Sequence, residues 1–182
     1  MTLIFETPRF IARQLELSDR HDMFRLDSDP EVHQYLGNNP IQSIEEVDAI
    51  IRSIQDQYAR LGVGRLAIID KVTDEFMGWA GLKKLETPYN NQVNVYDLGY
   101  RLLQQHWGKG VATETARGSL AYGFDQLQLD KITAMADCAN KGSNQVLIKV
   151  GMQLTETFML DGVLHNWYEL DKDTYRQQTA GV

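Results

Sequence analysis

The chain has 182 residues, 43% of them hydrophobic, which predicts one globular domain over residues 1–182 that buries its own core. The 18 basic residues against 25 acidic ones give a net charge of -7, which argues against a nucleic-acid partner. The single cysteine, Cys138, excludes an intramolecular disulfide and a multi-cysteine zinc site. We see neither a secretory signal pattern nor an apolar stretch of membrane-spanning length, so we expect a cytoplasmic protein without a membrane partner.

The first elements in chain order are a strand and a short helix. Polar and apolar residues alternate over 9–17, which is typical of a half-buried strand. Residues 18–26 then predict a short helix, for which Ser18 and Asp19 are the cap candidates.

The clearest helix is predicted over 43–62. Ser43 and Glu46 have the spacing of a capping box, and Gly62 is a natural stop. Apolar residues form one stripe along this helix: Ile44, Val47, Ile51, Ile54 and Tyr58.

The rest of the chain alternates between strands and helices. We expect strands over 65–70, 75–84, 94–103 and 131–138, helices over 113–124 and 143–151, and a terminal hairpin of 153–160 and 164–170 around Asp161 and Gly162. Within the first of these helices, Ala112, Ala116, Leu120 and Phe124 share one side at a spacing of four. The pattern favours an α/β fold in which one sheet carries helices on both faces.

A glycine-rich stretch, "GKGVAT", stands between a predicted strand and a predicted helix. Unpaired N–H groups and the dipole at a helix start favour phosphate, and Gly108 and Gly110 would let an anion approach the backbone. Thr113 stands where a dinucleotide-binding fingerprint needs a third small residue, and the Lys-Ser/Thr pair of a P-loop is missing. The alternative is an ordinary tight turn before a helix.

Four segments taken together resemble one protein family. They are "TPRFIARQLELSD", "DPEVHQYLG", "DLGYRLLQQHWGKGVATETA" and "NKGSNQVLIKVGM", and they occur in the family's order over nearly the whole chain. The sequence resembles the GNAT superfamily of acetyl-CoA-dependent N-acetyltransferases, in particular the Rim-type branch that acetylates ribosomal-protein N-termini. This resemblance implies a mixed, mostly antiparallel sheet with a splayed strand pair that binds acetyl-CoA.

The resemblance also implies a set of coenzyme-binding residues. The pyrophosphate loop would run through Trp107, Gly108, Lys109, Gly110, Val111, Ala112 and Thr113. Trp107 departs from the family's Gln or Arg, so only the backbone part of that contact carries over. The main chain of Tyr100, Arg101 and Leu102 would hold the pantetheine arm. Glu114 would repel phosphate, so we expect its side chain to point away from the loop.

Catalytic candidates come from the same resemblance. Asn140 would bind the coenzyme arm, and Ser143 would protonate the leaving thiolate, directly or through water. The alternative for Ser143 is a helix cap. Leu147 stands where many relatives have a tyrosine that acts as the general acid for the leaving thiolate. Its absence here favours Ser143 as the acid. Asp97 is the candidate general base, and its alternative is a polar residue in the strand.

Several other residues and partners remain as expectations. The acceptor is expected to be a primary amine, such as a protein N-terminus, an amino sugar, a polyamine or an amino acid, with specificity set near Tyr35, Tyr58 and Trp167. His106 and His165 are interpreted as surface histidines, and Cys138 is not a nucleophile. No metal is expected, and the chain is a monomer or a homodimer. The rival functions are a non-catalytic acyl-CoA-binding module and a different enzyme that binds a phosphate ligand.

Overall fold

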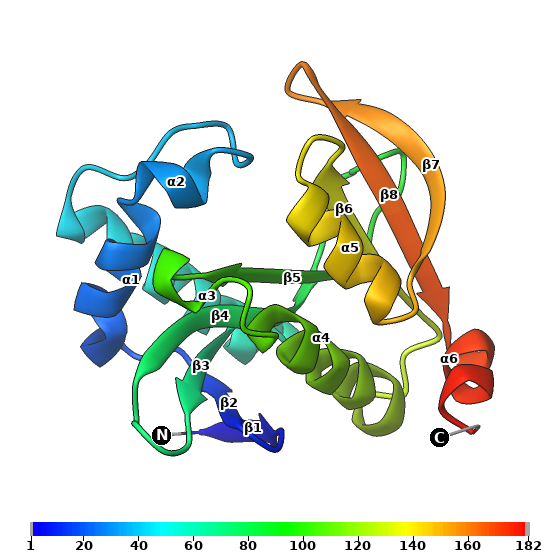
Figure 1. Cartoon of the computed structure of the whole chain (residues 1–182), viewed down its shortest axis with the longest axis horizontal. Coiled ribbons are helices and arrows are strands. Elements are labelled where there is room, and N and C mark those ends of the chain that lie inside the picture. The colour runs from blue at the N-terminus through cyan, green and yellow to red at the C-terminus, as the bar shows by residue number, and fades with distance from the viewer. Residues whose placement is uncertain (1, 181–182) are drawn as a thin grey trace.

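The computed structural model describes residues 2–180, and its centre is one open sheet of eight strands (Figure 1). The strand order is β1-β2-β3-β4-β5-β6-β8-β7. The strands are β1 (Leu3–Glu6), β2 (Phe10–Gln14), β3 (Leu66–Asp70), β4 (Phe76–Lys84), β5 (Tyr96–Leu102), β6 (Lys131–Asp137), β7 (Gln153–Leu160) and β8 (Val163–Asp171). Only the β5·β6 pair is parallel, so the expected mixed, mostly antiparallel sheet is confirmed.

Helices lie on both faces of this sheet, as expected. The helices are α1 (Arg20–Asp27), α2 (Pro30–His33), α3 (Ile44–Leu61), α4 (Val111–Ala121), α5 (Lys141–Lys149) and α6 (Lys172–Thr179). One core joins α1 and α3 to the first half of the sheet through Met23, Val47 and Ile51. On the other face α4 and α5 close a second core that includes Leu120 and Leu147. Within residues 2–180, no helix is long and apolar enough to cross a membrane.

Local sequence signals explain the best-predicted elements. The capping box of Ser43 and Glu46 is present at the start of α3, and Gly62 ends that helix in the left-handed conformation with φ of 70°. The β7–β8 hairpin turns at Asp161 and Gly162, whose φ angles of 49° and 78° suit a tight two-residue turn.

Other boundaries differ from the expectation. Strand β1 and helices α2 and α6 lie in segments for which no element was predicted, and α4 begins two residues earlier than residue 113. The predicted helix over 18–26 begins as a 3₁₀ turn, Leu17–Asp19, before α1. The Asp19 carboxylate does not cap α1. It pairs with Arg13 instead, at 2.7 Å, and accepts the Glu16 N–H.

Candidate active site

The two parallel strands β5 and β6 separate at the centre of the sheet. Their ladder holds only two pairs, Tyr96 with Ile132 and Asp97 with Thr133. Beyond Asp97, β5 continues to Leu102 paired with β4 alone, and Figure 1 shows β6 running away from it. One edge of β5 therefore faces an opening in the sheet instead of a neighbouring strand, and such an edge can pair with an extended ligand.

The glycine-rich loop comes after β5 and is separated from it by a 3₁₀ turn over Gln104–His106. Its exposed residues include Gly108 and Gly110, with φ of 71° and 78°, which is the left-handed region that glycine adopts most easily. Gly110 is the N-cap of α4, and the first N–H to bond back into this helix is that of Glu114. The preceding N–H groups of the first turn have no partner within the helix and form an anion-binding end.

Trp107, the departure from the family pattern, turns back onto β5. Its indole Nε1 donates a hydrogen bond of 2.9 Å to the carbonyl oxygen of Leu102. The side chain thus fixes the loop to the end of the strand and occupies one of the main-chain groups that the sequence assigned to the pantetheine arm.

Glu114 points away from the loop, as expected, and holds the start of the chain. Its Oε1 accepts hydrogen bonds from the Thr7 hydroxyl at 2.7 Å and the Arg9 N–H at 2.9 Å. Its Oε2 accepts from Arg9 Nε at 2.7 Å, and Arg9 Nη1 donates to the carbonyl oxygen of Lys109 at 3.1 Å. The β1–β2 hairpin is therefore tied both to α4 and to the glycine-rich loop, and we call this set of Thr7, Arg9, Lys109 and Glu114 the loop clamp.

Asn140, and not Ser143, caps α5. Helix α5 begins at Lys141, and the Asn140 Oδ1 accepts the N–H of Ser143 at 3.1 Å. The capping interpretation of Ser143 is therefore wrong, and its hydroxyl is left for another role. That hydroxyl lies 3.1 Å from the Tyr100 hydroxyl. Leu147 is buried in the core against the sheet.

A residue that the sequence analysis overlooked, Asn144, anchors the first turn of α5. Its Nδ2 donates to the carbonyl oxygens of Asp137 at 2.8 Å and Asn140 at 2.7 Å. Its Oδ1 accepts from Asn166 Nδ2 and from the Tyr168 hydroxyl, both at 2.7 Å. Because this amide joins α5 to β6 and β8, the backbone of the Asn140–Ser143 turn is held firmly beside the opening.

Asp97 stands at the last β5–β6 pair, where the strands begin to separate. Its side chain is nearly buried and pairs through Oδ2 with the Arg65 guanidinium at 2.5 Å, while Oδ1 is buried and makes no hydrogen bond within residues 2–180. Burial raises the pKa of Asp97 above its ordinary value, against the opposing pull of Arg65. Gly99 leaves room for this guanidinium, because a Cβ there would lie 2.6 Å from Arg65 Nη2.

A second ion pair lies on the same face of β5. Arg101 Nη1 donates to Asp27 of α1 at 2.6 Å, and the guanidinium groups of Arg65 and Arg101 stack at 5.3 Å and 5.0 Å from the ring centre of Trp79. His33 of α2 is buried near this pair, and burial together with the Arg101 charge lowers its pKa. This side of the opening therefore has paired charges over an aromatic floor.

Several other candidates lie elsewhere. His106 is buried and its Nε2 lies 3.3 Å from Glu75 Oε1, so its interpretation as a surface histidine is wrong. Trp167 is fully buried and donates from Nε1 to Glu169. The Tyr58 hydroxyl donates to the carbonyl oxygen of Arg65, which fixes that side chain inside the fold.

The remaining candidates are half-buried. Tyr35 follows α2, and the ring of His165 lies 5.9 Å from that of Phe158. Cys138 donates from Sγ to Asn166 Oδ1 at 3.2 Å. Among residues 2–180 no group of three or more His, Cys, Asp or Glu side chains has the arrangement of a metal site.

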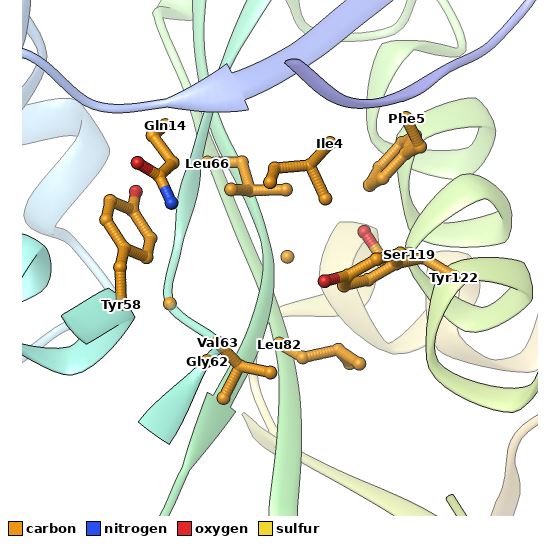
Figure 2. A pocket seen from close by; sticks show the side chains of 12 residues that line it. Ile4, Phe5, Gln14, Tyr58, Gly62, Val63, Leu66, Leu82, Ser119 and Tyr122 are labelled. Carbon is orange, nitrogen blue, oxygen red and sulfur yellow. The ribbon is translucent and has the colours of Figure 1, made fainter. Parts of the chain in front are cut away.

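An enclosed pocket and an open groove lie among the described residues. Figure 2 shows an enclosed pocket between β1, the end of α3 and α4, lined by Ile4, Tyr58 and Ser119 among others. Its volume of about 10 Å³ is enough for roughly one water molecule, so it is no substrate site. An open groove of about 530 Å³ follows the end of β5 and is lined by Arg25, Asp29, Leu103, Gln104 and Gln105.

The sequence profile described as "Acetyltransferase (GNAT) domain" matches residues 9–153. An uncharacterized N-acetyltransferase, p20 of Bacillus licheniformis, is 32% identical over 147 residues, covering 81% of this chain and 80% of that protein. The putative ribosomal N-acetyltransferase YdaF of Bacillus subtilis is 28% identical over 134 residues, and the matched segment covers 72% of this chain and 68% of that protein.

Solved structures show the same fold. A GNAT-family acetyltransferase from Bacillus anthracis superposes with a TM-score of 0.78 at 20% identity, over 94% of this chain and 99% of that one. Spermidine N-acetyltransferase from Vibrio cholerae, in complex with CoA and spermine, superposes with a TM-score of 0.74 at 19% identity, over 91% and 97% of the two chains.

Proposed function

Because the chain belongs to the GNAT acetyltransferase family, we propose that it transfers the acetyl group of acetyl-CoA directly to a primary amine. The observation that supports this most is the position of the glycine-rich loop. It follows the strand that borders the opening, so one continuous segment offers both an unpaired strand edge and an anion-binding helix start. An extended ligand with a phosphate end fits that combination.

The proposed coenzyme contacts divide into backbone and side-chain groups. The loop from Trp107 to Thr113 would hold the pyrophosphate through its N–H groups, and the edge of β5 over Tyr100, Arg101 and Leu102 would hold the pantetheine arm. Asn140 would contribute its Nδ2, since its Oδ1 already accepts the N–H of Ser143. Exposed glycines with positive φ and an unpaired first turn fit such a ligand.

Two side chains are proposed to move protons. Asp97 would take a proton from the attacking amine through its buried, unbonded Oδ1 or through a water molecule. Ser143 would donate a hydrogen bond to the leaving sulfur and help to protonate it, either by giving up its own proton and regaining one from water or by orienting a water molecule that supplies the proton. A main-chain N–H at the opening would stabilise the negative charge on the thioester oxygen. Asp97 is paired with Arg65, and the acceptor amine's own pKa decides how much help from a base the attack needs.

The acceptor is proposed to be a protein N-terminal α-amine. The four-segment resemblance to the Rim-type branch and the name of YdaF support it. A small amine such as a polyamine is the second candidate, which the spermine complex of the Vibrio cholerae enzyme favours. We further propose a single domain over residues 1–182, a cytoplasmic location, and a monomer or homodimer.

The test is calorimetric titration with acetyl-CoA, CoA and ATP. We expect both coenzyme forms to bind at a ratio of one to one and at least tenfold more tightly than ATP. Tighter binding of ATP would contradict the assignment and favour another phosphate-ligand enzyme. Coenzyme binding without acetyl transfer to any amine would instead support the non-catalytic binding module.

A further inference from the structure

The side chain of Tyr100 extends from β5 to the first turn of α5, where its hydroxyl contacts Ser143. Tyr100 lies three residues beyond Asp97, the last position at which β5 pairs with β6. Its ring packs against the core on the α4 side of the sheet. Its hydroxyl lies 2.9 Å from the carbonyl oxygen of Ser143 and 3.1 Å from the Ser143 Oγ. A strand residue therefore contacts both oxygen atoms of the candidate acid.

These two contacts decide where the serine hydrogen points. A phenol has one hydrogen, so Tyr100 donates either to the Ser143 carbonyl or to the Ser143 Oγ. If it donates to the carbonyl, the 3.1 Å contact between the two hydroxyls is a hydrogen bond only when the serine donates to the tyrosine oxygen. If it donates to Oγ, the serine hydrogen is released and points elsewhere. The direction of the Ser143 hydrogen is thus set by one rotation of the Tyr100 hydroxyl.

Neighbouring residues hold both the first turn of α5 and the Tyr100 ring in place. Asn140 and Asn144 fix the backbone of the first turn of α5, and the Tyr100 ring is held by the core. Burial also raises the pKa of Tyr100 above its ordinary value, so the phenol keeps its hydrogen at neutral pH. The two hydroxyl oxygens are therefore held 3.1 Å apart, and either hydroxyl can donate to the other.

We propose that Tyr100 is a positioning residue that aims the Ser143 hydroxyl at the sulfur of the bound coenzyme. The inference rests on the proposed function and adds to it a side-chain role for Tyr100, whose main chain alone was assigned to the coenzyme. When a sulfur atom occupies the opening, Tyr100 donates to Ser143 Oγ and Ser143 donates to the sulfur. Tyr100 itself neither touches the sulfur nor loses its proton.

The test compares Tyr100→Phe, Ser143→Ala and the double variant, with Tyr122→Phe as the matched control. The Tyr122 hydroxyl makes no hydrogen bond within residues 2–180, and its side chain packs near Phe5. Phenylalanine keeps the ring at both positions, so the fold is preserved. The first readout is the affinity for CoA relative to desulfo-CoA, which lacks the sulfur, and the second is kcat and KM for acetyl-CoA with one amine.

We expect the wild-type protein and Tyr122→Phe to prefer CoA over desulfo-CoA by about fivefold, in line with one hydrogen bond. Tyr100→Phe and Ser143→Ala should bind the two ligands within twofold of each other. Tyr100→Phe should lower kcat about tenfold with little change in KM, and the double variant should be no worse than Ser143→Ala.

Two results would overturn the inference. One is an unchanged preference for CoA in Tyr100→Phe, and the other is a loss in the double variant equal to the product of the two single losses. If the wild-type protein binds CoA but transfers no acetyl group, the proposed function fails first and the positioning role fails with it. If the wild-type protein transfers acetyl and Tyr100→Phe matches it, only the positioning role fails.

Discussion

At the scale of single residues, the buried Asp97 is a carboxylate whose pKa burial raises above its ordinary value. Desolvation favours the neutral form of Asp97 and raises its pKa, whereas the Arg65 charge favours the ionised form and opposes that shift. A base of this kind matters most for an acceptor amine that is strongly protonated at neutral pH. An α-amine with a pKa near 8 needs little help, whereas an alkylamine near 10.4 needs more.

Asp97→Asn should therefore separate acceptor classes. We expect kcat/KM to fall about 100-fold for an alkylamine and less than tenfold for a peptide α-amine, in the range of general-base effects. The loss of the carboxylate partner of Arg65 will also lower the thermal unfolding midpoint, so rates are measured well below it and divided by the concentration of coenzyme-binding sites. An equal fall in kcat/KM for both amines, or no fall, would show that Asp97 is not the general base.

Gly110 gives a second prediction at this scale. Its φ of 78° makes any side chain costly, and a Cβ would lie 3.3 Å from Arg9 Nη2. Gly110→Ala should lose about 1 kcal/mol of unfolding free energy and at least tenfold in affinity for acetyl-CoA. Gly37→Ala is the control, because Gly37 has φ of 83° and open space around it.

The control variant should lose the same stability and keep its affinity, as measured by urea unfolding and calorimetric titration. If the two variants bind acetyl-CoA equally well, the loop around Gly110 does not hold the coenzyme.

At the scale of elements, the loop clamp couples the first hairpin to α4. Burial pushes the pKa of Glu114 up, but the hydrogen bonds from Thr7 and Arg9 outweigh it, and the pKa lies below its ordinary value. The stabilisation from this carboxylate is therefore present above the unfolded-state pKa of about 4.3 and is lost as the pH falls through the lower folded-state pKa.

Glu114→Gln should reduce the unfolding free energy by about 2 kcal/mol at pH 7, because it weakens hydrogen bonds to a charged group. The difference from wild type should shrink as the pH falls below the unfolded-state pKa of about 4.3 and through the lower folded-state pKa, because the wild-type carboxyl then takes up a proton as well. Urea unfolding at several pH values measures both effects, and Glu45→Gln, an exposed acid in the first turn of α3, is the matched control. A difference that does not depend on pH would mean that the Glu114 charge contributes nothing.

Elements with strong local signals were predictable and those without them were not. The α3 capping box, the helix start after the glycines and the β7–β8 turn each follow from residues close together in sequence. Strand β1 has four residues and α2 has four, too few for a period to be recognised. Ser143 was a plausible cap by residue type, but the preceding Asn140 starts the helix earlier and takes that role.

At the scale of the whole molecule, the candidate site depends on contacts that no local pattern contains. Glu114 and Arg9 are 105 residues apart, Tyr100 and Ser143 are 43 apart, and Arg65 and Asp97 are 32 apart. The family resemblance pointed to the glycine-rich loop and Ser143 as candidates, because those positions are carried by short motifs. It did not locate the partners Arg65 and Asn144, since long-range pairing follows from sheet order and not from spacing.

Ligand binding should change the sheet at the opening and leave the rest unaltered. Hydrogen exchange should show new protection over residues 98–102 and 107–114 when CoA is added, because main-chain N–H groups there gain partners. Strands β2 and β3, which are paired on both sides in the described chain, serve as the internal reference. Uniform protection over all strands would indicate general stabilisation and not a ligand in the opening.

The most direct test of the central claim is the release of free thiol from acetyl-CoA by the wild-type protein, followed with a peptide α-amine, a polyamine, an amino sugar and an amino acid in turn. The account predicts amine-dependent thiol release with one acetyl group on the amine for each thiol, fastest with the peptide. Thiol release that is no faster with any amine than without one would contradict it.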